Sequence, residues 1–225
     1  MTEGTYGIVV VGAGRMGRGI GLSFAWAGYA VALVDSERRT AEAFAEIATT
    51  TVAELKRESG SLADAGILTY AAADEIAARI DVVKRADSGA ILQAADFVFE
   101  AVAEDLEIKR STYAWLGEAT NDIAILASTT STMLSDTLAG FVVHPERFTN
   151  AHWLNPAYLM PLVEISPAAH TGADGVDALR ELLESIGKVP VVCRASPGYI
   201  VSRIQALVLN EAARLVDEEI GRAHV

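Results

Sequence analysis

The feature that most constrains the fold is a glycine-rich turn near the N-terminus. An apolar run at 7–11 leads directly into Gly12, Gly14 and Gly17, spaced G-x-G-x-x-G, and a helical pattern follows. A strand, a glycine turn and a helix in this order are typical of a dinucleotide-binding unit. Gly12 would allow the tight turn, Gly14 would let the backbone approach a pyrophosphate, and Gly17 would let the helix pack against its strand.

The first turn of the following helix is the expected phosphate site. Its unpaired backbone N–H groups and the positive end of the helix dipole favour an anion without a cationic side chain. Arg15 and Met16 lie in this turn and are candidate cofactor contacts. The glycine motif alone is weak, so the interpretation depends on the residues that follow.

Length, charge and cysteine content narrow the class of protein. The chain has 225 residues, enough for one large α/β domain or for a medium domain and part of a second. Its formal net charge of -12 argues against nucleic acid and anionic membrane as partners, since both need a basic surface. The single cysteine, Cys193, excludes an intrachain disulfide. With no signal-like N-terminus and no apolar run of transmembrane length, we expect a soluble, cytoplasmic protein.

A second parallel strand is predicted at 29–34, and it ends at Asp35. An acidic residue about 20 residues beyond the glycines suits hydrogen bonds to the ribose hydroxyls and would repel a 2′-phosphate. NAD is therefore the expected cofactor, although Arg38 and Arg39 lie close enough to keep NADP open. The alternative for Asp35 is an N-terminal cap of the next helix. The glycine spacing favours the cofactor interpretation.

The remaining chain alternates helical and strand patterns, which predicts a Rossmann-type α/β fold with a doubly wound, mostly parallel sheet. Helices are expected at 20–28, 37–58, 74–79, 88–94, 172–186 and 199–220, and strands at 80–83, 96–102, 123–127, 161–165 and 189–193. Gly60 and Gly66 are expected to interrupt the chain after the second helix. Pro190 places the last strand at a sheet edge.

Polar residues follow two of the central strands, where doubly wound sheets bind their ligands. Glu104 and Lys109 follow the strand at 96–102, and five hydroxyl residues at 128–132 follow the strand at 123–127. Taken alone, Glu104 and Lys109 fit an ordinary helix start and a surface lysine. Any single one of these hydroxyl residues fits a helix cap better, whereas the cluster as a whole favours ligand contact.

His152 and Glu164 lie twelve residues apart, near the ends of strands, so that a return strand would bring them together. A carboxylate bonded to an imidazole fixes the tautomer of the ring and suits a general base or acid for an alcohol and ketone pair. No group of residues has the spacing of a metal site.

Together these motifs resemble the L-3-hydroxyacyl-CoA dehydrogenase family, whose relatives include lambda-crystallin (a gulonate dehydrogenase) and carnitine dehydrogenase. The matching segments beyond the glycine turn cover nearly the whole chain in the order of the family: 99–109, 127–131, 144–148, 152–156, 161–164 and 187–191.

The resemblance implies roles for the matched residues. His152 would take the hydroxyl proton while hydride leaves the adjacent carbon for the nicotinamide, and Glu164 would hold its ring. Ser131 would bond the substrate oxygen and contact the cofactor, and Asn155 would lie near the nicotinamide.

Two further residues, Glu104 and Lys109, match cofactor-contacting positions of the family. One position departs from it, because Ser202 stands where an active-site asparagine is expected in the family's Gly-Phe-x-x-Asn-Arg pattern. A serine offers a shorter side chain with one hydroxyl instead of an amide.

The resemblance also implies the domain organisation. Residues 1–194 would form the NAD-binding domain, and 195–225 would begin a helical domain of which the first helix alone is present. The ending at 221–225 does not continue the helical pattern before it. The apolar stripe of that helix predicts at least a homodimer.

We therefore expect an NAD-dependent oxidoreductase that interconverts a 3-hydroxyacyl-CoA, or a similar 3-hydroxy acid, and its 3-keto form. A substrate of the gulonate or carnitine type fits the same residues. A catalytically weak NAD-binding protein of the same fold is the alternative from another class.

Overall fold

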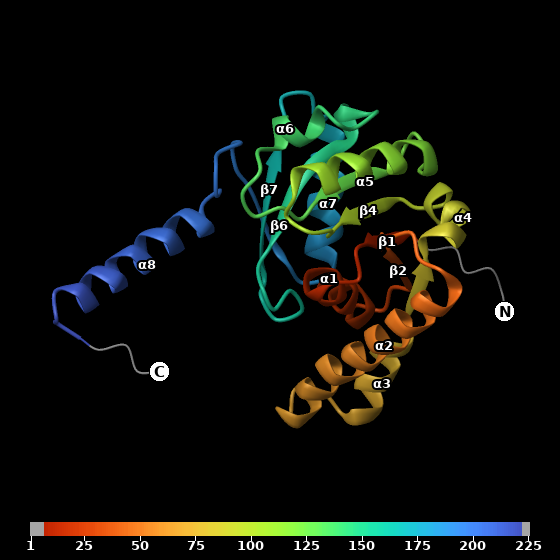
Figure 1. Ribbon diagram of the computed structural model, residues 1–225, viewed down its shortest axis with the longest axis horizontal. Helices are drawn as coiled ribbons and strands as arrows, with labels where there is room; N and C mark the ends of the chain where they lie inside the picture. The colour runs from red at the N-terminus through yellow and green to blue at the C-terminus, as the bar shows by residue number, and fades with distance from the viewer. Residues whose placement is uncertain (1–6, 222–225) are drawn as a thin grey trace.

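Eight strands form one sheet in the computed structural model, which describes residues 7–221 (Figure 1). The spatial order is β3-β2-β1-β4-β5-β6-β7-β8. Neighbouring strands pair in parallel except β6 and β7, which are antiparallel. The bounds are β1 (Ile8–Val11), β2 (Val31–Asp35), β3 (Ile80–Lys84), β4 (Phe97–Glu100), β5 (Ile125–Ser128), β6 (Phe148–Trp153), β7 (Leu162–Pro167) and β8 (Val189–Val192). The predicted Rossmann-type architecture is confirmed.

Helices cover both faces of this sheet. They are α1 (Arg15–Trp26), α2 (Ala41–Asp64), α3 (Tyr70–Ala78), α4 (Gly89–Gln93), α5 (Leu106–Ala119), α6 (Ser135–Ala139), α7 (Ala173–Ser185) and α8 (Val201–Asp217). Because side chains of a strand alternate between faces, Ile8 and Val10 join a core with α1 and α7, whereas Val9 and Val11 join a second core with α4 and α5.

Helix α2 differs from its predicted bounds of 37–58. It begins at Ala41, because the Thr40 side chain caps it by accepting a hydrogen bond from the backbone of Ala43. It continues through Gly60 to Asp64, so the expected interruption at Gly60 is wrong. The chain turns instead at Gly66, which has a φ of 73°.

Two other elements can be compared with their predictions. Helix α3 starts earlier than predicted, at Tyr70, because Thr69 caps it. Strand β8 lies at the sheet edge, as Pro190 predicts, because an edge strand can lack one ladder donor.

Helix α8 extends away from the sheet in Figure 1 and buries none of its residues. Its apolar stripe is exposed, with Leu207 71% and Leu209 69% accessible. Of the expected ending at 221–225, residues 222–225 lie outside the described part of the chain. Within residues 7–221, no helix is both long and apolar enough to cross a membrane.

Candidate active site

The glycine turn joins β1 to α1 in a conformation that requires glycine at two of its positions. Gly12 has a φ of 111°, and a Cβ there would lie 2.5 Å from the Ala101 carbonyl oxygen. A Cβ on Gly17 would lie 1.8 Å from the Gly12 carbonyl oxygen, so the helix packs directly on the turn. The conformational reasons predicted for these two glycines are confirmed.

Gly14 differs from its neighbours, because a Cβ there would meet no atom within 4 Å. It is the N-cap of α1, and no side chain caps the first turn. The surface beside Gly14 is therefore open to the hollow and no side chain occupies the cap, which is what an approaching pyrophosphate needs.

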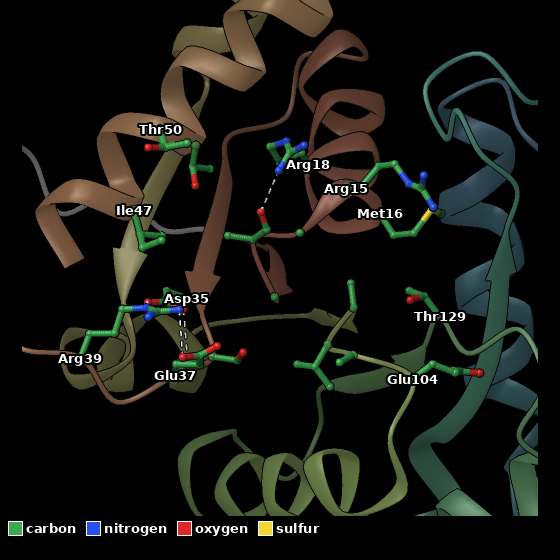
Figure 2. A pocket seen from close by; sticks show the side chains of 18 of the residues that line it. Arg15, Met16, Arg18, Asp35, Glu37, Arg39, Ile47, Thr50, Glu104 and Thr129 are labelled. Atoms are coloured by element: carbon green, nitrogen blue, oxygen red, sulfur yellow. Dashed lines mark hydrogen bonds and ion pairs between the residues drawn. The ribbon is translucent and has the colours of Figure 1, made fainter. Parts of the chain in front are cut away.

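A hollow of about 610 Å³ opens in front of this turn. Figure 2 shows Arg15 and Met16 at one side of it, Ile47 and Thr50 of α2 at another, and Glu104 and Thr129 opposite α2. Its walls thus come from the carboxyl ends of β1, β2, β4 and β5 and from the two helices α1 and α2. This is where doubly wound folds bind dinucleotides.

Asp35 ends β2 at the wall of the hollow and is 4% exposed. Its Oδ2 accepts a hydrogen bond from Arg39 Nε at 2.7 Å, and its Oδ1 accepts one from the backbone of Glu37 at 3.3 Å. The alternative that Asp35 caps α2 is wrong, because Thr40 is the cap. A carboxylate at this place fits ribose hydroxyls.

Glu104 lies between the hollow and the hydroxyl loop after β5. Its Oε1 accepts hydrogen bonds from the Thr130 hydroxyl, from the backbone of Ser131 at 3.1 Å, and from both the backbone and the hydroxyl of Thr132. Burial alone would raise the pKa of the Glu104 carboxyl, but the Thr130 hydrogen bond and the charge of Lys109 lower it overall. Glu104 therefore stays ionised and fixes the loop that carries Ser131.

Lys109 is buried and does not lie at the surface, where it could contact a cofactor directly. Its side chain is 1% exposed, its Nζ lies 2.8 Å from Glu100 Oε1, and it does not line the hollow. Glu100 also accepts hydrogen bonds from the hydroxyls of Tyr113 and Ser128. Lys109 Nζ also lies 3.6 Å from Glu104 Oε2, so it links the buried Glu100 cluster to a carboxylate that lines the hollow.

His152 and Glu164 face each other across the antiparallel strands β6 and β7, where they are register partners. His152 Nδ1 lies 2.8 Å from Glu164 Oε2, and the two side chains are 4% and 1% exposed. The predicted proximity is confirmed. Because the carboxylate can only accept, it holds the proton on Nδ1 and leaves Nε2 as the basic nitrogen of the neutral ring.

The start of α8 completes the surroundings of this pair. Glu164 Oε1 accepts hydrogen bonds from the backbone N–H groups of Ile200 at 2.8 Å and Val201 at 3.1 Å. The Tyr199 ring stacks on the His152 ring, with centroids 5.2 Å apart. The Tyr199 hydroxyl donates to the Met133 carbonyl and accepts from the Asn150 amide. Burial raises the pKa of Tyr199 well above its usual value, so it stays neutral.

Sequence reasoning missed Tyr199 and the two backbone donors. Tyr199 has a φ of 46°, a left-handed conformation that few non-glycine residues adopt. The available signal was the Gly198 beside it, which indicates a sharp turn of the chain.

The other predicted site residues lie apart from this pair. Ser131 is exposed and lines the hollow, Asn155 is exposed in the loop after β6, and Ser202 is half-buried in the first turn of α8. Within residues 7–221, no hydrogen bond joins any of the three to His152 or Glu164. Across the described part of the chain, no group of three or more His, Cys, Asp or Glu side chains is placed to hold a metal ion.

Comparison with known proteins shows the family to which the chain is similar. Residues 7–196 match the family model described as "3-hydroxyacyl-CoA dehydrogenase, NAD binding domain". The chain is 33% identical over 218 residues to 3-hydroxyadipyl-CoA dehydrogenase of Escherichia coli, covering 97% of this chain and 44% of that protein. It is 32% identical over 216 residues to the lambda-crystallin homolog of Mus musculus, and the match covers 95% of this chain and 65% of that protein.

Among solved structures, (S)-3-hydroxybutyryl-CoA dehydrogenase from Ralstonia eutropha superposes with a TM-score of 0.80 at 30% identity. The match covers 95% of this chain and 72% of that one. The chain spans from less than half to about two thirds of the length of the two curated relatives named above.

Proposed function

This chain belongs to the 3-hydroxyacyl-CoA dehydrogenase family, and on that basis we propose that it transfers hydride between NAD and a 3-hydroxyacyl substrate or its 3-keto form. The observation that carries the proposal is the buried His152–Glu164 pair in the same sheet whose strand ends line a hollow with the features of a dinucleotide site. The lining suits NAD, because Gly14 leaves room for a pyrophosphate and the Asp35 carboxylate would accept hydrogen bonds from ribose hydroxyls.

His152 is the proposed base. When bound, NAD supplies the acceptor for the hydride that leaves the hydroxyl-bearing carbon. Nε2 of His152 takes the hydroxyl proton as the O–H bond breaks, and in the reverse direction it returns that proton to the carbonyl oxygen. Glu164 keeps the ring in the productive tautomer and stabilises the imidazolium that forms.

Other residues hold the substrate and the cofactor in this proposal. The Ser131 hydroxyl donates to the substrate oxygen, and Asn155 lies near the nicotinamide. Ser202 offers its hydroxyl to the substrate from the first turn of α8, next to the Val201 N–H that binds Glu164. Glu104 and Lys109 together hold the loop that carries Ser131.

We propose that residues 1–194 form the NAD-binding domain and that 195–225 begin a helical domain. The family match, which ends at residue 196, supports this boundary. The net charge of -12 and the single cysteine support a small-molecule substrate and a cytoplasmic location rather than nucleic acid or membrane.

One observation favours a second candidate, an NAD-binding protein with little turnover. The His152 side chain is only 4% exposed and lies under the Tyr199 ring. A substrate therefore finds little of this ring open to solvent.

Turnover separates the two candidates. The purified chain is mixed with NADH and a panel of 3-keto thioesters, beginning with acetoacetyl-CoA, and of 3-keto acids, and NADH oxidation is recorded beside NADH binding. We expect binding and oxidation with at least one thioester. Binding without oxidation of any member supports the second candidate, and absence of NADH binding contradicts both.

A further inference from the structure

A second hollow, of about 480 Å³, adjoins the first at its ribose end. Glu37 and Arg39 line both hollows, and Figure 2 shows them beside Asp35. The second hollow lies at the carboxyl ends of β2 and β3, where Lys84 is the register partner of Asp35. We call it the basic hollow; its polar lining consists of Glu37, Arg38, Arg39, Lys84 and Arg85.

The charge of the basic hollow is opposite to that of the whole protein. Four cationic side chains face one carboxylate there, although the chain carries a formal net charge of -12. Within residues 7–221, Arg38, Lys84 and Arg85 have no carboxylate within ion-pairing distance. Glu37 in the lining and Glu42, whose pKa is lowered by backbone and side-chain hydrogen bonds and by the charge of Lys84, offset these cations only in part, so an added anion would stabilise the cluster.

Arg85 is already held in position for such an anion. Its Nη1 donates to the Ser36 carbonyl at 2.9 Å, and its guanidinium lies 4.0 Å from the centre of the Trp115 ring. Partial burial and the charge of Arg38 lower the pKa of Arg85. Since two neutral groups fix this guanidinium, its remaining donors are not engaged by a carboxylate.

Asp35 is the residue expected to repel a 2′-phosphate, but its negative charge is partly neutralised by Arg39. Arg39 Nε bonds Asp35 Oδ2 at 2.7 Å, and Arg39 Nη2 lies 2.9 Å from Glu37 Oε2. Asp35 can still accept from a ribose hydroxyl, while a phosphate on the neighbouring oxygen would point toward the cations of the basic hollow.

We propose that the basic hollow binds the 2′-phosphate of NADP(H), so that this chain accepts NADP(H) as well as NAD(H). The inference rests on the proposed function only in taking the first hollow as the nucleotide site. Arg38, Lys84 and Arg85 supply the charge-assisted hydrogen bonds, and Arg39 shields Asp35.

The test measures binding of NADH and NADPH to the full chain by calorimetry, for the wild type, the Arg38→Ala/Lys84→Ala variant and a control, Lys56→Ala. Lys56 is exposed on α2 and outside both hollows. In the wild type we expect the two cofactors to bind within about tenfold of each other. The double variant should lose about tenfold or more for NADPH and keep NADH binding, and the control should change neither.

Competition identifies the phosphate. We expect 2′,5′-ADP to displace NADPH better than 3′,5′-ADP or inorganic phosphate, and to lose this advantage in the double variant. An Arg38→Glu variant, changed at one exposed residue, should likewise lose NADPH binding and keep NADH binding. The melting temperature of each variant is recorded to show that it is folded. Binding of NADH but not NADPH to the wild type, or equal competition by the three phosphates, overturns the inference. Failure to bind either cofactor would instead contradict the proposed function.

Discussion

Gly14 is the glycine of the turn that the fold itself does not require, so we assign it a role in binding. Gly12 and Gly17 are required by the backbone itself, because a Cβ at either position would overlap a carbonyl oxygen. Gly14 has an ordinary φ of -72° and an open surrounding, so its reason lies outside the protein chain. We attribute it to the pyrophosphate that approaches this turn.

We predict that Gly14→Ala weakens NADH binding by about tenfold or more, or about 1.4 kcal/mol, because its Cβ occupies the path of the pyrophosphate. The free energy of unfolding should change by less than about 1 kcal/mol, as for an N-cap substitution. Calorimetric titration and urea unfolding measure the two quantities.

The matched control is Gly60→Ala, which lies inside α2 with no atom within 4 Å of its Cβ. It should stabilise the fold by about 0.5–1 kcal/mol and leave NADH binding unchanged. Unaltered NADH binding in Gly14→Ala would show that the turn does not hold the pyrophosphate.

Single residues also mark the limit of what the sequence predicts. Glu100 and Lys109 carry charges, so the pattern alone favours a solvated lysine, yet both are buried in one hydrogen-bonded cluster. That outcome depends on Tyr113 and Ser128, which come from α5 and β5 and reach Glu100 only in the folded chain. A local pattern contains no information on such convergence.

At the level of elements, the strands for which bounds were predicted lie close to the observed ones, whereas helix ends differ more and no bounds were predicted for β6. Buried β-branched runs identify β1 and β2 directly, whereas the bounds of α2 depend on a Thr40 cap and on tolerance of Gly60 inside the helix. The pairing of His152 with Glu164 follows from the return of β7 along β6, which a spacing of twelve residues permits. The stack of Tyr199 depends on where the chain crosses after β8, which no spacing encodes.

Helix α8 carries a prediction of its own. Its apolar side chains are exposed, including Ile204, Leu207 and Val208 at 56%, 71% and 62%. We expect the chain to form at least a dimer through this helix, because burying the stripe removes apolar surface from water. Light scattering at micromolar concentration should give at least twice the mass of one chain.

Leu207→Glu should shift this equilibrium toward the monomer, since it places a charge in the centre of the stripe. Ile67→Glu is the control, because Ile67 is 51% exposed in the turn between α2 and α3. A wild-type chain that is monomeric under these conditions would refute the role of α8.

At the scale of the whole molecule, one sheet connects two sites of different character. The carboxyl ends of β1, β2, β4 and β5 line the first hollow, and β6 with β7 carries the His152–Glu164 pair. Glu164 also binds the first backbone groups of α8, so the position of that helix and the orientation of His152 are linked. The sequence predicts both sites but not this connection, which needs the three-dimensional path of the chain.

The central claim is that His152 moves the proton of the reaction and does not hold the cofactor. The most direct measurement compares His152→Ala with His144→Ala, an exposed histidine that pairs with Glu146 and Asp122. We predict that kcat for 3-keto thioester reduction falls about 10²- to 10⁴-fold in His152→Ala, while the Kd of NADH changes less than about twofold. His144→Ala should keep both values. Full activity in His152→Ala would contradict the account.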